Sequence, residues 1–324
     1  MEMDRSLSTI EIDDVCKSYK DKVALKSLNL EINDGETLIL LGPNGSGKST
    51  LLKLMATLFC CDKGEITVFG KDLIKNKKEI RRNTGVLFDS IVHWDKLTGY
   101  ENAWFFARSY GLKKEYADYR IEYLFKQFNL WDNRNQSVSS YSYGMRRKLA
   151  LIEAMIHEPN VLLLDEPSMG LDYTSRLVLY NILQHEFKNS TVMLATNDVG
   201  EANIMAQRIA LLHKGRLLTV GTSEELINSV MNLNRIDLKL NAPLPLSELM
   251  GVQGVEYAEI KNSEMDYFQI QFLVKSEEDA LANIVNKVVE LNGRIKGIDV
   301  HEPTLEDVFL KYIGGSGGGN HITQ

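Results

Sequence analysis

Hydrophobic and polar residues alternate near the start of the chain, as at residues 10–12 (IEI) and 28–32 (LNLEI). A period of two is typical of a strand with one buried face. The run TLILL at residues 37–41 is apolar throughout and predicts a strand that is buried on both faces. Residues 8–41 therefore predict an antiparallel sheet that leads into a buried strand.

The pattern becomes helical further along the chain. The helical period predicts helices over residues 100–110, 116–128 and 146–157. Thr98 and Glu101 have the spacing of a capping box, and Ser142 is placed to cap the last of these helices. Aromatic residues are enriched over residues 94–131, which the core of a small helical subdomain, about residues 90–158, would explain. A docking surface for a partner is the alternative.

Apolar runs before and after these helices predict the strands of an α/β fold. They cover residues 64–70, 84–88, 161–167, 191–195, 209–213 and 216–220. The run at 161–167 ends in two acids, Asp165 and Glu166. The last side chains of a buried parallel strand lie at the edge of the sheet where nucleotides bind.

The pattern changes again after about residue 232. The predicted elements are strands at 236–240, 268–272 and 295–300, a helix between 276 and 293, and a closing helix at 302–310. The first helix is amphipathic, with one face formed by Leu281, Ile284, Val285, Val288 and Val289. We therefore predict a first domain over 8–230, a small α+β domain over 233–312 and a flexible glycine-rich tail over 313–324.

Composition limits the class of protein. The chain has 324 residues, of which 44% are hydrophobic, and this is long enough for more than one domain. The net charge is −7 without a basic tract, so nothing favours nucleic acid as a ligand. The three cysteines, Cys16, Cys60 and Cys61, lack metal-ligand spacing, and neither a signal peptide nor a membrane-spanning run is evident. These features predict a reduced cytosolic protein that reaches a membrane only through another chain.

The candidate chemistry centres on GPNGSGKST at residues 42–50, between the buried strand and a helical run at 50–59. It fits the phosphate-loop pattern G-x-x-x-x-G-K-[ST]. Its glycines allow successive N–H groups to surround the oxygens of a di- or triphosphate. Lys48 would reach the β- and γ-phosphates, and the Ser49 hydroxyl would ligate Mg²⁺. The alternative is a glycine-rich turn before an ordinary helix.

Three other positions extend this hypothesis. Asp165 can hold the Mg²⁺ shell, and Glu166 can polarise an attacking water. Tyr19 lies between the first two predicted strands, where its ring could stack on a purine; an ordinary packing tyrosine is the alternative.

The motifs together identify a family resemblance. GPNGSGKST at 42–50, YSYGM at 141–145, VLLLDEP at 161–167 and SMGLD at 168–172 resemble the ATP-binding subunit of ABC transporters. The match covers about residues 8–230 and implies a P-loop NTPase fold with an antiparallel β subdomain and a helical subdomain. YSYGM and the closing EPTLEDVFL are similar to the drug- and sodium-exporting, ABC-2-type branch, which carries a small C-terminal domain.

The resemblance also implies site residues. Tyr19 stacks on adenine, and phosphates and Mg²⁺ are held by Gly42, Pro43, Asn44, Gly45, Ser46, Gly47, Lys48, Ser49 and Thr50. Ser142 and Gly144 bind the γ-phosphate held by the opposite subunit. Glu166 is the catalytic carboxylate, and Asp172 belongs to the loop that couples the two sites.

Two positions depart from the family pattern. Asp89 replaces the glutamine that touches Mg²⁺ and senses the transport subunit, and Asn197 replaces the switch histidine. Asn197 can donate a neutral hydrogen bond to the γ-phosphate, but it has no protonatable ring. Slow hydrolysis with intact nucleotide binding is therefore expected.

The sequence thus predicts an ATPase subunit that forms a homodimer or heterodimer, binds ATP and Mg²⁺, and powers an ABC-2-type permease at the inner face of the cell membrane. One alternative is a nucleotide-binding regulatory module that hydrolyses ATP weakly. Another is a soluble ABC-type ATPase that acts on ribosomes or in DNA repair, although the chain lacks a basic tract and a long coiled-coil insertion.

Overall fold

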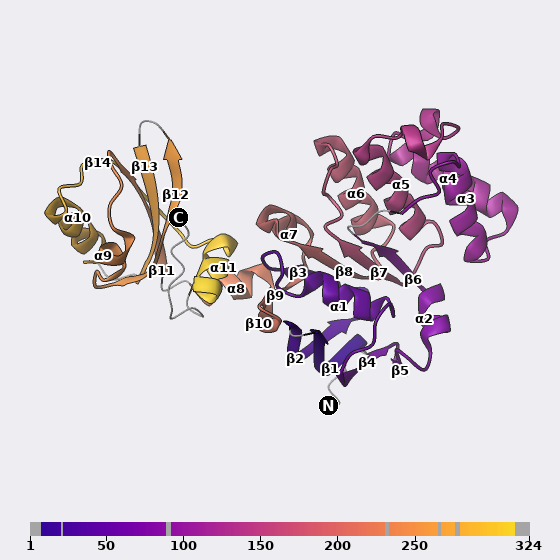
Figure 1. Ribbon diagram of the computed structural model, residues 1–324, viewed down its shortest axis with the longest axis horizontal. Helices are drawn as coiled ribbons and strands as arrows, with labels where there is room; N and C mark the ends of the chain where they lie inside the picture. Colours follow the sequence, from indigo (N-terminus) through magenta and orange to yellow (C-terminus); the bar gives the residue numbers. More distant parts are fainter. Residues whose placement is uncertain are drawn as a thin grey trace. The chain divides into compact units, whose positions relative to one another are not determined.

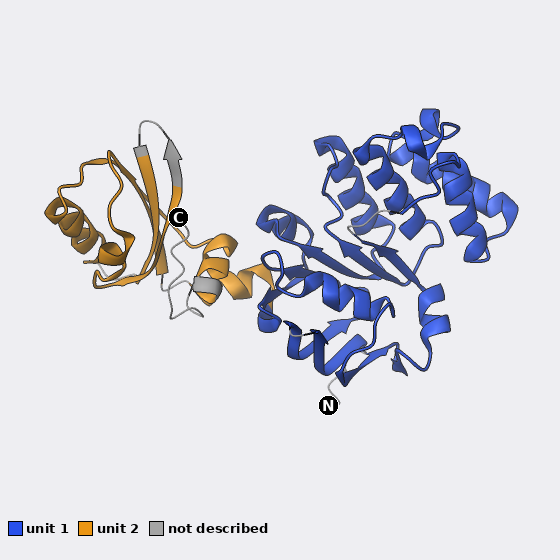
Figure 2. Cartoon of the chain, viewed as in Figure 1, with its two compact units in different colours: residues 1–220 blue, residues 221–324 orange. Residues whose placement is uncertain are grey.

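The computed structural model describes residues 8–20, 22–88, 92–230, 233–264, 267–275 and 279–314 (Figure 1). The chain divides into two compact units, Met1–Val220 and Gly221–Gln324 (Figure 2). Among the described residues, none of the helices combines the length and the apolar character needed to cross a membrane.

A parallel arrangement of strands forms the centre of the first unit. Its 6-stranded sheet has the order β10-β9-β3-β8-β7-β6. The strands are β3 (Thr37–Leu41), β6 (Thr84–Leu87), β7 (Val161–Asp165), β8 (Thr191–Thr196), β9 (Arg208–His213) and β10 (Arg216–Gly221). β3 is parallel to β8 and β9, and β7 is parallel to β6 and β8. The carboxyl ends of these strands therefore meet at one edge, where α/β sheets bind ligands.

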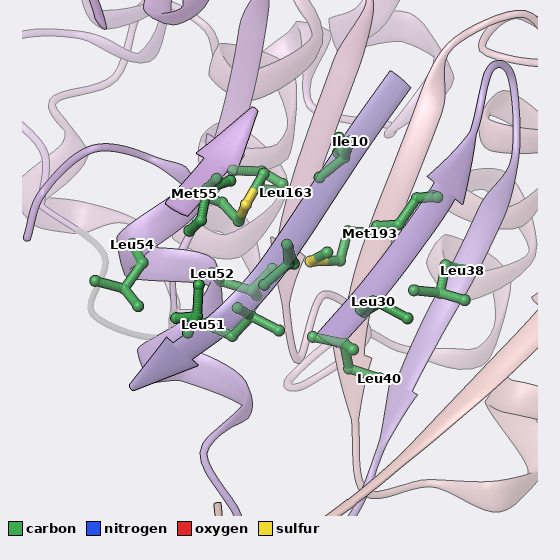
Figure 3. Close-up of a cluster of buried hydrophobic side chains, with 14 of the residues drawn as sticks. Ile10, Leu30, Leu38, Leu40, Leu51, Leu52, Leu54, Met55, Leu163 and Met193 are labelled. Carbon is green, nitrogen blue, oxygen red and sulfur yellow. The ribbon is translucent and has the colours of Figure 1, made fainter. Parts of the chain in front are cut away.

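An antiparallel sheet completes the β structure of this unit, in the order β2-β1-β4-β5. Its strands are β1 (Ser8–Tyr19), β2 (Lys22–Asn33), β4 (Lys63–Val68) and β5 (Lys71–Asp72). Helix α1 (Lys48–Met55) contributes to one core with both sheets (Figure 3). This core includes Ile10, Leu30, Leu52, Met55, Leu163 and Met193. The helix that follows the phosphate loop is thus packed against strands of both sheets.

The remaining helices of the first unit are α2 (Lys77–Arg82), α3 (Gly99–Ser109), α4 (Lys114–Gln127), α5 (Tyr143–Met155), α6 (Tyr173–His185) and α7 (Val199–Met205), with short 3₁₀ turns at Trp131–Asn133 and Val138–Ser140. The capping box of Thr98 and Glu101 and the capping of α5 by Ser142 are confirmed. The sequence pattern did not indicate α2, α6 or α7. It also extended α1 to residue 59, whereas the helix ends at Met55.

The second unit has a 4-stranded sheet in the order β12-β13-β11-β14. Its elements are α8 (Ser223–Asn228), β11 (Leu233–Leu240), α9 (Leu246–Met250), β12 (Val255–Glu264), β13 (Tyr267–Lys275), α10 (Ala280–Glu290), β14 (Ile295–His301) and α11 (Leu305–Gly314). From β11 to β14 the chain follows the ferredoxin-like β-α-β-β-α-β order. Of the apolar face predicted for α10, Ile284 and Val288 are buried, whereas Val289 is 63% exposed. Most of the predicted tail, residues 315–324, lies outside the described residues.

Candidate functional site

The loop between β3 and α1 has two positions that only glycine fits. Gly47 is the N-cap residue of α1 and has a φ of 116°, and a Cβ at this position would lie 2.8 Å from the Ala24 carbonyl oxygen. A Cβ at Gly42 would lie 2.2 Å from the Leu212 carbonyl oxygen. The loop can therefore curl at the amino end of α1, where N–H groups and the helix dipole favour an anion.

Lys48 is the first residue of α1, and its side chain lies in this loop with 5% exposure. Its Nζ donates to the Gly42 carbonyl oxygen at 2.6 Å and to the Pro43 carbonyl oxygen at 3.3 Å. The Glu166 Oε1 atom is 3.9 Å away. Burial lowers the pKa of Lys48, and the carboxylates of Glu166 and Asp165 oppose this shift. The ammonium group thus lies between the loop and the end of β7.

Glu166 directly follows β7 and adopts a φ of 47°, which is rare for residues other than glycine. Burial raises the pKa of its carboxyl group, whereas Lys48 and the backbone N–H of Asn197 lower it. The Thr196 hydroxyl donates to Glu166 Oε2 at 3.5 Å. Asp165, the last residue of β7, is 2% exposed. The two acids therefore lie at the carboxyl edge of the parallel sheet, as the sequence predicts.

One pocket of about 290 Å³ brings many of the predicted residues together. It is lined by Tyr19, Lys22, Ala24, Asn44, Gly45, Ser46, Gly47, Lys48, Ser49, Thr50, Asp165 and Glu166. The Ser46 side chain is 2% exposed, and its Oγ has no hydrogen-bond partner among the described residues. A buried hydroxyl in this condition fits a ligand that supplies the missing partner.

The donor atoms of the pocket also fit Mg²⁺. Ser49 and Asp165 line it and offer a hydroxyl and a carboxylate oxygen. Among the described residues, no three His, Cys, Asp or Glu side chains cluster as a metal cage. Mg²⁺ in nucleotide sites uses one or two protein oxygens together with phosphate and water. Ser49 and Asp165 would therefore hold it.

Ser142, Gly144 and Asp172 do not line this pocket. Ser142 Oγ accepts from the Met145 N–H at 3.2 Å and caps α5. Asp172 caps α6 and lies 3.4 Å from Lys148 Nζ. A Cβ at Gly144 would be 2.9 Å from the Gly170 carbonyl oxygen, so the two turns lie close together. These residues form a separate surface of the first unit.

The two departures from the family pattern are placed differently. Asn197 is exposed, immediately after β8, and its backbone N–H bonds to the Glu166 carboxylate. Asn197 therefore lies at the end of β8, and Glu166 lies at the end of the neighbouring strand β7. Asp89 lies outside the described residues, so its assignment as a metal ligand stays a prediction.

Three residues at or near the site were not predicted from the sequence pattern. Lys22 and Ala24 line the pocket from β2, and only their closeness to Tyr19 in the sequence could have indicated them. Arg147 of α5 was also missed, although its guanidinium Nη2 donates to the Glu166 carbonyl oxygen at 2.5 Å.

A phosphate loop after a central parallel strand, with acids at the end of an adjoining strand, defines the class of P-loop NTPases. Residues 25–169 match the ABC transporter family. The daunorubicin resistance ATP-binding protein DrrA3 of Streptomyces coeruleorubidus is 32% identical over 95% of this chain and 96% of that protein. The ABC transporter ATP-binding protein NatA of Bacillus subtilis is 34% identical over 68% of this chain and 92% of that protein.

Solved structures lead to the same family. A structure titled as the ATP-binding subunit of an ABC transporter has a TM-score of 0.65 and 26% identity, over 68% of this chain and 93% of its own. A dimeric ATP-binding cassette in a post-hydrolysis state, bound to ADP and Pi, has a TM-score of 0.60 and 26% identity, over 66% of this chain and 98% of its own. This chain belongs to the ATP-binding proteins of the ABC transporter family.

Proposed function

We propose that this chain hydrolyses ATP as a dimer and powers export by a separate ABC-2-type permease. The observation that carries the proposal is the single pocket in which Tyr19, Lys48, Asp165 and Glu166 meet. It combines an aromatic ring for the base, a cation and N–H groups for the phosphates, and carboxylates for Mg²⁺ and water.

Each residue has a part in the proposed reaction. The Tyr19 ring stacks on adenine, while the loop N–H groups and Lys48 hold the β- and γ-phosphates. Bound Mg²⁺ would neutralise phosphate charge, with Ser49 and Asp165 as its protein ligands. Glu166 orients the attacking water and accepts a proton from it. Positioning and charge stabilisation provide most of the catalysis.

We propose dimerisation because one chain does not bring all of its expected nucleotide-binding residues to its own pocket. Ser142 and Gly144 lie on a separate surface, so they would contact the γ-phosphate of an opposite subunit in a head-to-tail dimer. The similar cassettes with dimeric structures support a dimer. Either a homodimer or a heterodimer satisfies it.

The permease partner is proposed from the relatives. Their names include daunorubicin resistance, linearmycin resistance and Nod factor export ATP-binding proteins. The chain would be held at the cytoplasmic face of the membrane through that permease. The net charge of −7 does not favour nucleic acid as a partner.

Replacing Glu166 by Gln tests the proposal. We expect the variant to bind ATP and Mg²⁺ but not to hydrolyse ATP, because the amide cannot act as a base. ATP should then convert the protein from monomer to a stable dimer, measured as a doubling of mass by light scattering.

Lys48→Ala in the same Glu166→Gln background is the control. It removes the cation that lies between the loop and Glu166, so ATP should neither bind nor cause dimerisation. If Glu166→Gln alone hydrolyses ATP at the parental rate, Glu166 is not the catalytic carboxylate. Identification of the co-purifying membrane protein tests the permease partner.

A second candidate is a regulatory module that turns over ATP slowly. Asn197 favours it, since this residue lacks the protonatable ring of the family's switch histidine. ATPase turnover measured with and without the permease separates the two functions. A rate that rises with the permease supports the transport ATPase, whereas a low rate in both conditions supports the regulatory module.

A further inference from the structure

Arg147 of α5 is a charged side chain inside the first unit, with 0% exposure. Its Nη1 donates to the Phe88 carbonyl oxygen at 2.9 Å, and its Nη2 donates to the carbonyl oxygens of Asp165 and Glu166 at 2.6 and 2.5 Å. A buried charge is costly unless such hydrogen bonds compensate it. The guanidinium is planar with several donors, so it can bond to two strand ends at once. Arg147 thus joins α5 to the ends of β6 and β7.

We propose that Arg147 is a positioning residue for Glu166 and that it connects the turn of Ser142 and Gly144 to the Glu166 carboxylate of the same chain. The inference rests on the proposed function, in which Glu166 acts on water. Arg147 itself contacts the backbone carbonyl oxygens of Asp165 and Glu166 and does not line the nucleotide pocket.

The conformation of Glu166 makes such support necessary. Its φ of 47° lies in a region that a side chain disfavours and that surrounding contacts must maintain. The Glu166 N–H donates to the Ala195 carbonyl oxygen at 2.8 Å, and the Glu166 carbonyl oxygen accepts from Arg147. β8 therefore fixes one end of the residue and α5 fixes the other. Loss of either bond would let the carboxylate swing away from Lys48, whose Nζ is 3.9 Å away.

The same arginine lies on the helix that begins at the signature turn. Ser142 caps α5, and Arg147 occupies the next helical turn. Over so short a distance a helix moves as a rigid body, so a displacement of Ser142 and Gly144 also displaces the guanidinium. In a head-to-tail dimer, engagement of this turn with one ATP would therefore change the position of Glu166 at the other ATP.

Arg146 offers a matched control on the same helix. Its side chain is 30% exposed and bonds to Asp95 Oδ1 at 2.8 Å. Its other hydrogen bonds go to the carbonyl oxygens of Tyr141 and Ser139. Its charge matches that of Arg147, but its contacts lie away from Asp165 and Glu166.

The experiment compares Arg147→Met, Arg147→Lys and Arg146→Met in the full chain assembled with its permease. Methionine keeps the length but removes all donors, so we expect kcat to fall by about 10²-fold, the scale of a misplaced catalytic group. KM and the Kd for ATP should stay at the parental values. Lysine, which can still donate to a carbonyl, should recover part of the rate, and Arg146→Met should resemble the parent.

Parental kcat in both Arg147 variants overturns the inference, and so does an equal loss of kcat and ATP affinity, which indicates a general structural role. If Arg147→Met does not fold, Arg147→Lys decides between these outcomes. The ATP-dependent dimer of Glu166→Gln distinguishes a failure of the proposed function from a failure of the positioning role of Arg147. If that dimer is absent, the proposed function fails. If it forms while both Arg147 variants have parental kcat, only the positioning role fails.

Discussion

At the residue scale, the site depends on two groups of opposite charge, the buried Lys48 and the partly buried Glu166. Burial lowers the pKa of Lys48 and raises that of Glu166, and each group opposes the shift of the other across 3.9 Å. Removing Glu166 leaves the buried ammonium group of Lys48 without its carboxylate partner, which is an unfavourable state. For variants of Lys48 and Glu166, ATP affinity should therefore be measured together with kcat. The two measurements distinguish the loss of a charge partner from the loss of a catalytic group.

The raised pKa of Glu166 predicts a pH dependence. Its carboxyl group has a pKa above the ordinary value of 4.5, so protonation begins at a higher pH than for an exposed glutamate. Since only the carboxylate can act as a base, turnover at saturating ATP should fall as pH is lowered through this raised pKa. In a kcat–pH profile, we expect this fall to begin at a higher pH than the protonation of an ordinary glutamate would cause.

ATP binding by Glu166→Gln over the same pH range is the control for that profile. Its affinity should stay nearly constant while the parental kcat declines. A parallel decline of affinity and kcat would assign the acid limb to nucleotide binding and not to Glu166.

Asn197→His should accelerate hydrolysis. A well-placed donor to the transition state is worth about 10²- to 10³-fold in rate, and the asparagine amide retains part of this. We therefore expect a gain of up to about 10²-fold in kcat, with little change in ATP affinity. The measurement is steady-state turnover with the permease, alongside Asp89→Gln and the double variant. If histidine gives no gain in either background, Asn197 is not a deficient switch residue.

How far the site can be predicted depends on how local each contact is. The phosphate loop is contiguous, so its spacing alone indicates Lys48 and Ser49. Asp165 and Glu166 end an apolar strand, which places them at the ligand edge. Arg147 gives no such indication, because its partners are backbone carbonyls 18, 19 and 59 residues away in the sequence. A backbone acceptor is present at every residue, so side-chain patterns do not reveal which one is used.

At the element scale, a helix boundary set by local capping residues is easier to predict than one set by distant contacts. A cap uses residues within one turn, as Thr98 and Glu101 do. The end of α1 depends on distant contacts instead. Thr57 has a φ of 58°, and Arg81 donates to its hydroxyl and carbonyl oxygens. The left-handed conformation at Thr57 ends the helical run that the apolar pattern would continue, and α2, which carries Arg81, was itself not predicted.

Thr98→Ala should destabilise the first unit. Thr98 Oγ1 accepts from the Glu101 N–H at 3.1 Å, and the Glu101 carboxylate accepts from the Thr98 N–H at 2.8 Å. Loss of such a cap costs about 1 kcal/mol, which corresponds to a fall in Tm of roughly 2–4 °C. Ser109→Ala, at the other end of α3, is the control. Its hydroxyl bonds to the Phe105 carbonyl oxygen within the helix, so its loss should leave Tm unchanged. Equal Tm changes in the two variants would contradict a role for the cap.

At the scale of the whole molecule, the two units have separate hydrophobic cores. One core draws its described residues from 10–220, and the other draws them from 236–295. The sequence predicts a boundary near residues 230–233, where the strand pattern changes. The compact units divide earlier, at Val220, because α8 contacts α11 and Ser229 accepts from Lys311 Nζ at 3.1 Å. Contacts between segments so far apart in the sequence cannot be inferred from local periodicity.

Truncation tests whether the second unit contributes to nucleotide binding. Every residue that lines the nucleotide pocket belongs to the first unit. A chain that ends at Gly221, which keeps β10 complete, should therefore bind ATP with the parental Kd in a calorimetric titration. A chain that ends at Val230 should bind equally well but be less soluble, because α8 would lose α11 and expose Leu226.

Residues 221–314 produced alone are the complementary variant. Because the second unit has its own core, this fragment should unfold cooperatively in a thermal scan followed by circular dichroism. The full chain with Ile284→Asp, a substitution in that core, should retain its ATP affinity while the second unit unfolds. If the chain ending at Gly221 folds with the parental Tm of the first unit yet cannot bind ATP, the second unit is required for the nucleotide site and the proposed division is wrong.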